Sequence, residues 1–151
     1  MHSFFNSIYR PFVWIVILLF IIIYPMLISV YVFLPLFIGI MGYFFIRGIA
    51  EAKVQYLFVP IVYVTNLEVN LSLPLFLMII SFLLVYVLFY QNLTYFRRCQ
   101  ICKPILSVIL IDVFYLGMLV AYDFVFQTSS VVLDNLLLYS LIVDMLVVVI
   151  L

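Results

Sequence analysis

The chain has 151 residues, of which 71% are hydrophobic and 8% are charged, and its formal net charge is zero. About a quarter of the residues of a soluble domain are charged, so this composition predicts an integral membrane protein. Six membrane helices of about 20 residues each would use most of the chain. The remainder is too short for a soluble catalytic domain, a nucleotide-binding module or a nucleic-acid surface.

The first uncharged stretch covers residues 11–46. As one helix it would be about 54 Å long, which exceeds a hydrocarbon core of about 30 Å. Pro25 and Pro35 interrupt this stretch, and proline is best tolerated in the first turn of a helix. We therefore expect a tight helical hairpin. No small-residue cleavage site follows the first apolar run, which predicts an uncleaved membrane helix.

The second apolar region, residues 54–90, is divided by a polar cluster at 65–72 and by Pro74. Such a cluster is typical of a turn, so this region is also predicted to form two helices. A further polar turn at 127–130 separates the last two apolar segments. The six predicted helices cover residues 12–28, 31–46, 54–66, 73–90, 104–126 and 131–151.

The basic residues give the predicted orientation, because short cytoplasmic loops collect Lys and Arg. Merging either long region into one crossing would divide the basic residues between the two sides of the membrane. With six crossings they all fall on one side. The sequence thus predicts an all-α, polytopic membrane helix bundle of six transmembrane helices, one domain over residues 1–151, with both termini cytoplasmic. The basic residues are Arg10, Arg47, Lys53, Arg97, Arg98 and Lys103.

Acids within the last two predicted helices are candidates for a binding site. Asp112 is expected near mid-membrane, and Asp123 lies about three turns later on the same face, with Tyr115 to one side. Asp144 lies well inside the last helix, with Ser140 on nearly the same face. An acid at the bilayer centre costs about 2.5–3.5 kcal/mol on insertion scales. These acids either belong to a proton path, cation path or ligand site, or face neighbouring helices and specify packing.

A second candidate cluster consists of Asn66, Glu68 and Asn70, which are predicted to lie in an outer turn. A carboxylate flanked by amides would bind a cation or a basic group of a partner. Alternatively, these are the polar residues that any outer turn requires.

Cys99 and Cys102 are predicted to lie in a cytoplasmic loop, where thiols stay reduced. They are weak metal candidates because zinc takes four ligands and His2 is the only histidine. Loop thiols without a function are the favoured interpretation, and a zinc site shared between two subunits is the alternative. With one histidine, most hydrolytic chemistry lacks its usual residues. No enzymatic activity and no cofactor are therefore expected.

Three stretches carry a resemblance to a known family. The first opens with a proline and closes on a basic residue, as the second helix of that family does. In the second stretch, Pro60, Asn66 and Glu68 stand where the family usually has Gly residues and an Asp. The third resembles the family's loop and fifth helix, which often carries an acid, here Asp112. The stretches are Phe33-Leu34-Pro35-Leu36 to Phe45-Ile46-Arg47, Leu57 to Pro74, and Leu88-Phe89-Tyr90-Gln91-Asn92-Leu93 through Leu106-Ser107-Val108 to Asp112-Val113-Phe114.

In these stretches and in its six short spans, the chain resembles the MreD family of bacterial rod-shape-determining membrane proteins. The resemblance implies a non-enzymatic, multi-pass scaffold in the bacterial cytoplasmic (inner) membrane, within the cell-elongation complex that builds side-wall peptidoglycan and sets cell shape. Its implied partners are an MreC-like protein, other elongation-complex membrane proteins and the lipid bilayer, with homo-oligomers left open. That family's fold is similar to substrate-binding subunits of energy-coupling vitamin transporters. The alternative is therefore a small-molecule binding or transport subunit that uses Glu68, Asp112 and Asp144.

Overall fold

The structure, a computed structural model, describes residues 11–31, 34–93, 102–127 and 134–150. These residues form six α-helices and no strand, which confirms the predicted all-α class. In chain order the helices are α2 (Pro11–Val30), α3 (Ile38–Ala50), α4 (Val54–Asn70), α5 (Leu77–Leu93), α6 (Cys102–Phe126) and α7 (Asp134–Ile150).

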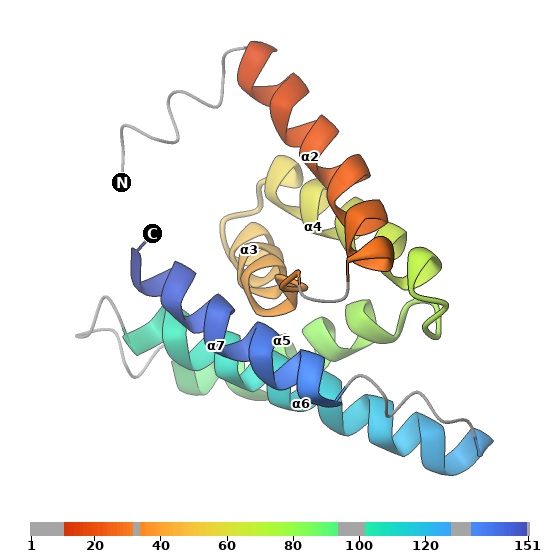
Figure 1. Cartoon of the computed structure of the whole chain (residues 1–151). Helices are drawn as coiled ribbons and strands as arrows, with labels where there is room; N and C mark the ends of the chain where they lie inside the picture. The colour runs from red at the N-terminus through yellow and green to blue at the C-terminus, as the bar shows by residue number, and fades with distance from the viewer. Residues whose placement is uncertain (1–10, 32–33, 94–101, 128–133, 151) are drawn as a thin grey trace.

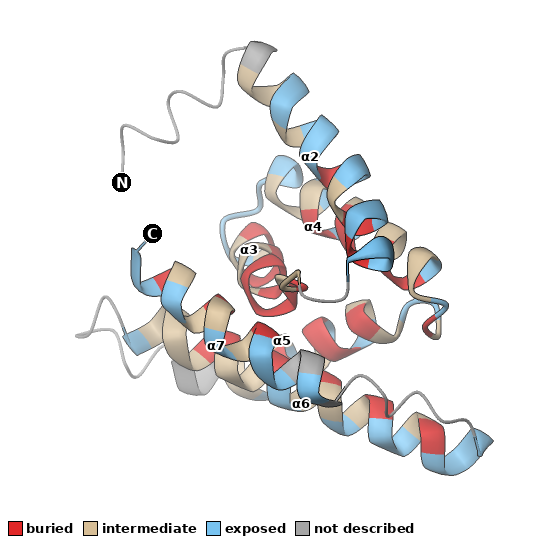
Figure 2. Cartoon of the chain, in the orientation of Figure 1, coloured by how far each residue is buried: buried red, intermediate tan, exposed pale blue. Residues whose placement is uncertain are grey.

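Helix α3 is the centre of the arrangement (Figure 1). It packs against α4, α5, α6 and α7, while α2 lies against α4. The burial pattern agrees with this position, because α3 is buried over much of its length whereas α2 is largely exposed (Figure 2). The last two helices, α6 and α7, pack side by side. Any residue at the amino end of α3 is therefore within reach of several other helices.

Several helix boundaries differ from the sequence prediction, and two of the differences shape the site. Helix α3 begins at Ile38 rather than at residue 31, since Phe37 has a left-handed backbone with φ of 50° and Pro35 disfavours helix in the residue before it. Helix α4 continues through the predicted turn to Asn70. The chain reverses after it, where Ser72 has φ of 52° and the N–H of Leu73 donates to the Glu68 carbonyl at 2.9 Å.

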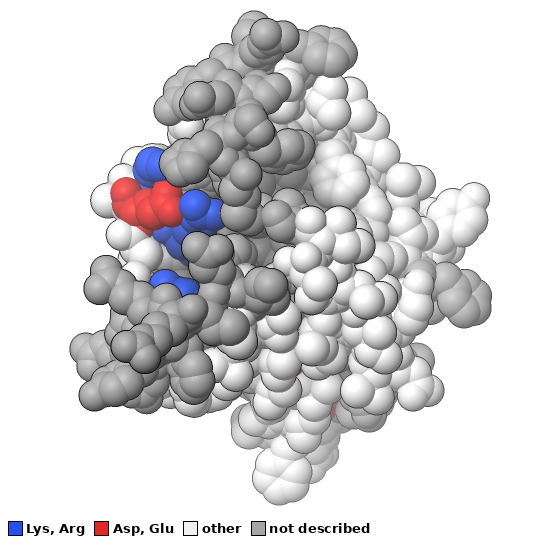
Figure 3. Space-filling model, turned by 90° about the vertical axis from the view of Figure 1, so that its left-hand side faces the viewer, with Lys and Arg blue, Asp and Glu red and all other residues white. Residues whose placement is uncertain are grey.

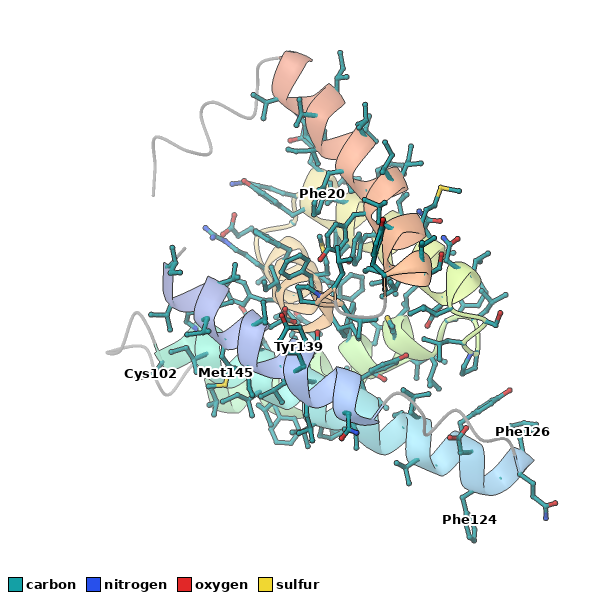
Figure 4. The ribbon with its side chains drawn as sticks, viewed as in Figure 1. Phe20, Cys102, Phe124, Phe126, Tyr139 and Met145 are labelled. Atoms are coloured by element: carbon teal, nitrogen blue, oxygen red, sulfur yellow. The ribbon has the colours of Figure 1, made fainter. Side chains whose placement is uncertain are left out.

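Apolar side chains cover much of the described exterior, and those of Phe124 and Phe126 at the end of α6 point away from the other helices (Figure 4). Two helices, α2 and α6, are long and apolar enough to cross a membrane, and α3, α5 and α7 contain shorter apolar segments. Lys53 and Arg47 bind Glu51 between α3 and α4 at 3.0 and 2.6 Å. In the face shown in Figure 3 the charged side chains gather near one edge, and most of the remaining described surface is uncharged.

Close packing of α3 on α6 depends on glycines. A Cβ at Gly42 would lie 2.7–2.9 Å from atoms of Ile111 and Phe82, and a Cβ at Gly39 would lie 2.6 Å from a methyl of Val108. Small residues allow helix backbones to approach each other in this way. By contrast, Gly117 on α6 has no atom within 4 Å of the position of a Cβ.

We predict that Gly42→Ala destabilises the fold by about 1–3 kcal/mol, because the added methyl overpacks the contact between α3 and α6. Gly117→Ala is the matched control, and it should leave stability unchanged or raise it by up to about 1 kcal/mol, since alanine is the better helix former. Reversible unfolding of both variants in mixed detergent micelles measures the difference. Equal effects of the two substitutions would contradict the packing shown for Gly42.

Candidate functional site: buried carboxylates at two helix amino ends

The short connection before α3 is partly buried although its backbone is not helical. Leu36 is only 1% exposed, so its backbone polar groups need partners within the protein. The Tyr24 hydroxyl donates to the carbonyl of Pro35 at 2.8 Å, and the Tyr63 hydroxyl donates to the carbonyl of Leu36 at 2.9 Å. The Tyr24 ring also stacks on the ring of Phe37, with centroids 5.3 Å apart. Two tyrosines from α2 and α4 thus satisfy the carbonyls of this connection.

Helix α7 satisfies the amides at the same place. The N–H of Leu36 donates to the Ser140 hydroxyl oxygen at 3.0 Å, and the N–H of Gly39 donates to Oδ2 of Asp144 at 2.8 Å. The first amides of a helix have no partner within the helix and carry partial positive charge. The Asp144 carboxylate therefore caps α3 from a helix more than a hundred residues away. Ser140 and Asp144 lie on one face of α7, as the sequence predicted.

Asp112 lies against the same glycine from α6. Its two carboxylate oxygens are 2.9 and 3.1 Å from the position that a Cβ at Gly39 would take, so any larger residue there would displace it. Asp112 is 8% exposed and Asp144 is fully buried. Among the described residues, neither Oδ2 of Asp112 nor Oδ1 of Asp144 has a hydrogen-bond partner. The structure thus brings together two of the predicted site residues, each with one unsatisfied oxygen.

Glu68 caps the amino end of α5 in a similar way. Its Oε2 accepts the N–H of Phe76 at 2.7 Å, and its Oε1 accepts the N–H of Met78 at 2.8 Å. The side chain is fully buried, which corrects the expectation that Glu68 faces outer water in a turn. The fourth turn of α4 carries it inward because the helix continues past residue 66.

A repeat in the sequence relates the two capped helix ends. Leu-Pro-Leu-Phe occurs at residues 34–37 and again at 73–76, exactly 39 positions later. Both phenylalanines have positive φ, 50° at Phe37 and 67° at Phe76, and a helix begins at the next residue each time. The amides that meet a buried carboxylate, those of Gly39 and Met78, are also equivalent. The two connections are therefore built alike, although different helices supply the acid.

Asn66 has a structural partner in α2. Its amide nitrogen donates to the carbonyls of Ile21 and Ile22 at 3.2 and 3.1 Å. Pro25 lies inside α2 and has no N–H for the carbonyl four residues before it, which is that of Ile21. Asn70 in turn donates to Asn66 at 2.8 Å. These amides hold α4 on the proline site of α2, and they do not form an outward-facing cluster with Glu68.

The remaining candidates are distributed along α6. Asp123 is 7% exposed and shares the buried face of α6 with Asp112, as predicted. Tyr115 is 1% exposed, and its hydroxyl has no hydrogen-bond partner among the described residues. Tyr115 lies near enough to Glu68 to interact with it electrostatically.

The cysteine pair is only partly described. Cys102 begins α6 and is disulfide-bonded, so the prediction of a reduced thiol at this position is wrong. Cys99 lies outside the described residues, as does His2. Within the described part of the chain, no three His, Cys, Asp or Glu residues lie close enough to hold a metal ion.

Sequence reasoning missed Gly39, Tyr24 and Tyr63, which belong to the same site as Asp112 and Asp144. The repeat is the signal that would have found the two tyrosines, because Tyr24 and Tyr63 also lie 39 positions apart. Their rings stack with centroids 6.4 Å apart. Neither tyrosine belongs to a recognisable motif by itself.

We predict that Asn66→Ala lowers stability by about 0.6–1.7 kcal/mol, the range for hydrogen bonds between membrane helices. In a Pro25→Ala background the same substitution should cost less, because the alanine N–H bonds to the Ile21 carbonyl that Asn66 serves in the wild type. A double-mutant cycle in detergent measures this coupling. Equal costs in the two backgrounds would show that Asn66 does not compensate for the proline.

The site thus consists of two buried aspartates at the amino end of α3 and one buried glutamate at the amino end of α5, all surrounded by apolar helices. No family model, curated protein or solved structure matches the chain. The functional interpretation therefore rests on this geometry and on the sequence.

Proposed function

We propose that the six helices form a membrane bundle with six crossings. Two helices have the length and composition of membrane spans. Helix α3 has 13 residues, about 20 Å, which is shorter than a hydrocarbon core of about 30 Å. The buried connection before it supplies the missing length. Non-helical backbone is tolerated at membrane depth where protein encloses it, and partners from α2, α4 and α7 enclose this connection.

Both termini are cytoplasmic in this proposal, because that orientation places every basic residue of the chain on one side. The charged group of Arg47, Glu51 and Lys53 lies between α3 and α4 and belongs to this side. The hydrogen bond from Arg47 lowers the pKa of Glu51, so this carboxylate stays charged at neutral pH. The disulfide at Cys102 favours the opposite orientation, since disulfides are rare in the cytosol. A direct measurement of orientation is therefore decisive.

Single cysteines test the orientation in a variant in which both natural cysteines are replaced by serine. A single Gln55→Cys, at the start of α4, should stay unlabelled by an impermeant thiol reagent in right-side-out spheroplasts. A single Leu75→Cys, in the turn before α5, should be labelled. Both positions are exposed in the structure, and both should react after the cells are lysed. Labelling of the first and protection of the second would invert the topology.

For function, we propose a non-enzymatic membrane scaffold of the cell-elongation complex, similar to MreD. The observation that carries this proposal is how the buried polar side chains are used. Asp144, Glu68 and Asn66 each hydrogen-bond the backbone of another part of the chain, and they are thereby committed to holding the bundle together. A packed bundle with an apolar exterior has its outer helix surfaces left for lipid and for membrane partners, including an MreC-like protein.

Depletion of the protein in its own cells tests this function. We expect rod-shaped or helical cells to round up, with no loss of uptake of any single nutrient, and the wild-type chain should restore shape. The Gly117→Ala variant is a matched control that should restore shape equally, since its packing is unchanged. Normal shape together with a specific growth-factor requirement would contradict the scaffold. That result would favour a small-molecule binding or transport subunit.

A further inference from the structure

We propose that Asp112 and Asp144 form a proton-binding site, in which one exchangeable proton is shared between Oδ2 of Asp112 and Oδ1 of Asp144. This inference is independent of the scaffold function. It starts from the two oxygens that the fold leaves unsatisfied, one on each carboxylate of the pair. A carboxylate oxygen can only accept a hydrogen bond, whereas a protonated one becomes a donor. One proton therefore gives both oxygens a partner, either directly or through a single water.

The position of the pair supports this arrangement. Both carboxylates lie against Gly39, since Asp144 accepts its N–H and Asp112 occupies the space of its missing side chain. Each residue is more than nine-tenths buried. Two neighbouring carboxylates in an apolar interior repel each other when both are ionised, and such pairs retain one proton between them.

The donors around the pair decide which residue carries the proton. Asp144 already accepts an amide at the positive end of α3, which favours its ionised form. Among the described residues no backbone amide donates to Asp112, although its carboxylate lies beside Gly39 at the same helix end. The proton therefore resides mainly on Asp112. Asp112 is the more exposed member of the pair, at 8% against 0% for Asp144. In this proposal, protons therefore reach the pair from the side of Asp112.

Among the described residues, the side chains that face the pair from other helices do not compensate the negative charge of its carboxylates. Tyr24 of α2 and Tyr63 of α4 lie near enough to Asp144 to interact with it electrostatically. Both hydroxyls already donate to the carbonyls of Pro35 and Leu36, so neither is available to Asp144 as a donor. From α3, the backbone amides of Gly39 and Ile40 contribute.

Glu68 provides an internal comparison at the equivalent place in the repeat. Both of its carboxylate oxygens accept backbone amides, from Phe76 and Met78. Two such donors favour the ionised form of a carboxylate and leave neither oxygen without a partner. The amides of Gly39 and Ile40 face Asp144, but its Oδ1 remains without a hydrogen-bond partner among the described residues, and a second carboxylate lies beside it. This difference distinguishes a proton-binding site from a simple helix cap.

Infrared spectroscopy of the full chain in lipid nanodiscs tests the proposal, because a protonated carboxylic acid has its own carbonyl band. With ¹³C-labelled aspartate, the wild type at neutral pH should show this band shifted by the label, and raising the pH should remove it. Asp112→Asn should fold normally, since its amide donates to Asp144 in place of the proton, and should lose the band. Asp123→Asn, three turns along the same face of α6, is the matched control and should retain it.

Three results would overturn the proposal. Absence of a protonated aspartate band in the wild type at neutral pH would show that the pair is ionised or holds a cation. Persistence of the full band in Asp112→Asn would assign the proton to another residue. Failure of Asp112→Asn to fold would mean that an amide donor cannot replace the proton, which the shared-proton geometry requires. The wild-type titration decides the first point without any substitution.

Discussion

Every buried backbone amide and carbonyl of this chain needs a partner inside the protein, and this constraint organises the structure around α3. A helix satisfies its own backbone except at its ends. Here two helix amino ends and one proline site lie among apolar side chains, where an unsatisfied polar group is costly. In each of these three places, a side chain from another helix supplies the missing hydrogen-bond partner. Three of its buried polar residues, Glu68, Ser140 and Asp144, therefore bond to backbone groups where regular helical hydrogen bonding stops.

This view explains why a sequence with so little charge retains acids in its helices. Glu68 and Asp144 accept the first-turn amides of α5 and α3, which have no carbonyl acceptor within their own helices. Each is a better acceptor than a hydroxyl, because it complements the positive end of a helix. The glycine at position 39 then lets a second acid approach the same end. The amino end of α3 thus holds both the cap that the helix requires and the carboxylate pair that we propose binds a proton.

Much of the fold could be predicted from the sequence, because apolar runs and their polar interruptions are local features. All six helices were expected, and the burial of Asp112 and Asp144 followed from their depth in the last two segments. The start of α3 could not be predicted in this way. Residues 34–37 are apolar enough for a helix, and their non-helical form depends on Tyr24, Tyr63 and Ser140, which lie far away in the chain.

The same limit explains the error at Glu68. A polar cluster next to a proline predicts a turn, but Thr65 donates to the carbonyl of Ile61 and Asn66 reaches α2, so the helix continues. The repeated Leu-Pro-Leu-Phe segment was the one sequence signal that links the two helix starts. Its meaning becomes clear only when both phenylalanines are seen with positive φ.

The cap on α3 also sets an order of events during synthesis. Leu36 and Gly39 meet Ser140 and Asp144 across sequence separations of 104 and 105 residues. At about 5–20 residues per second, the first half of the chain waits on the order of ten seconds before its partners emerge from the ribosome. Until then the amides of Leu36 and Gly39 at the start of α3 lack the acceptors that they have in the folded protein. The central helix of the protein can therefore reach its native state only after the last helix has been translated.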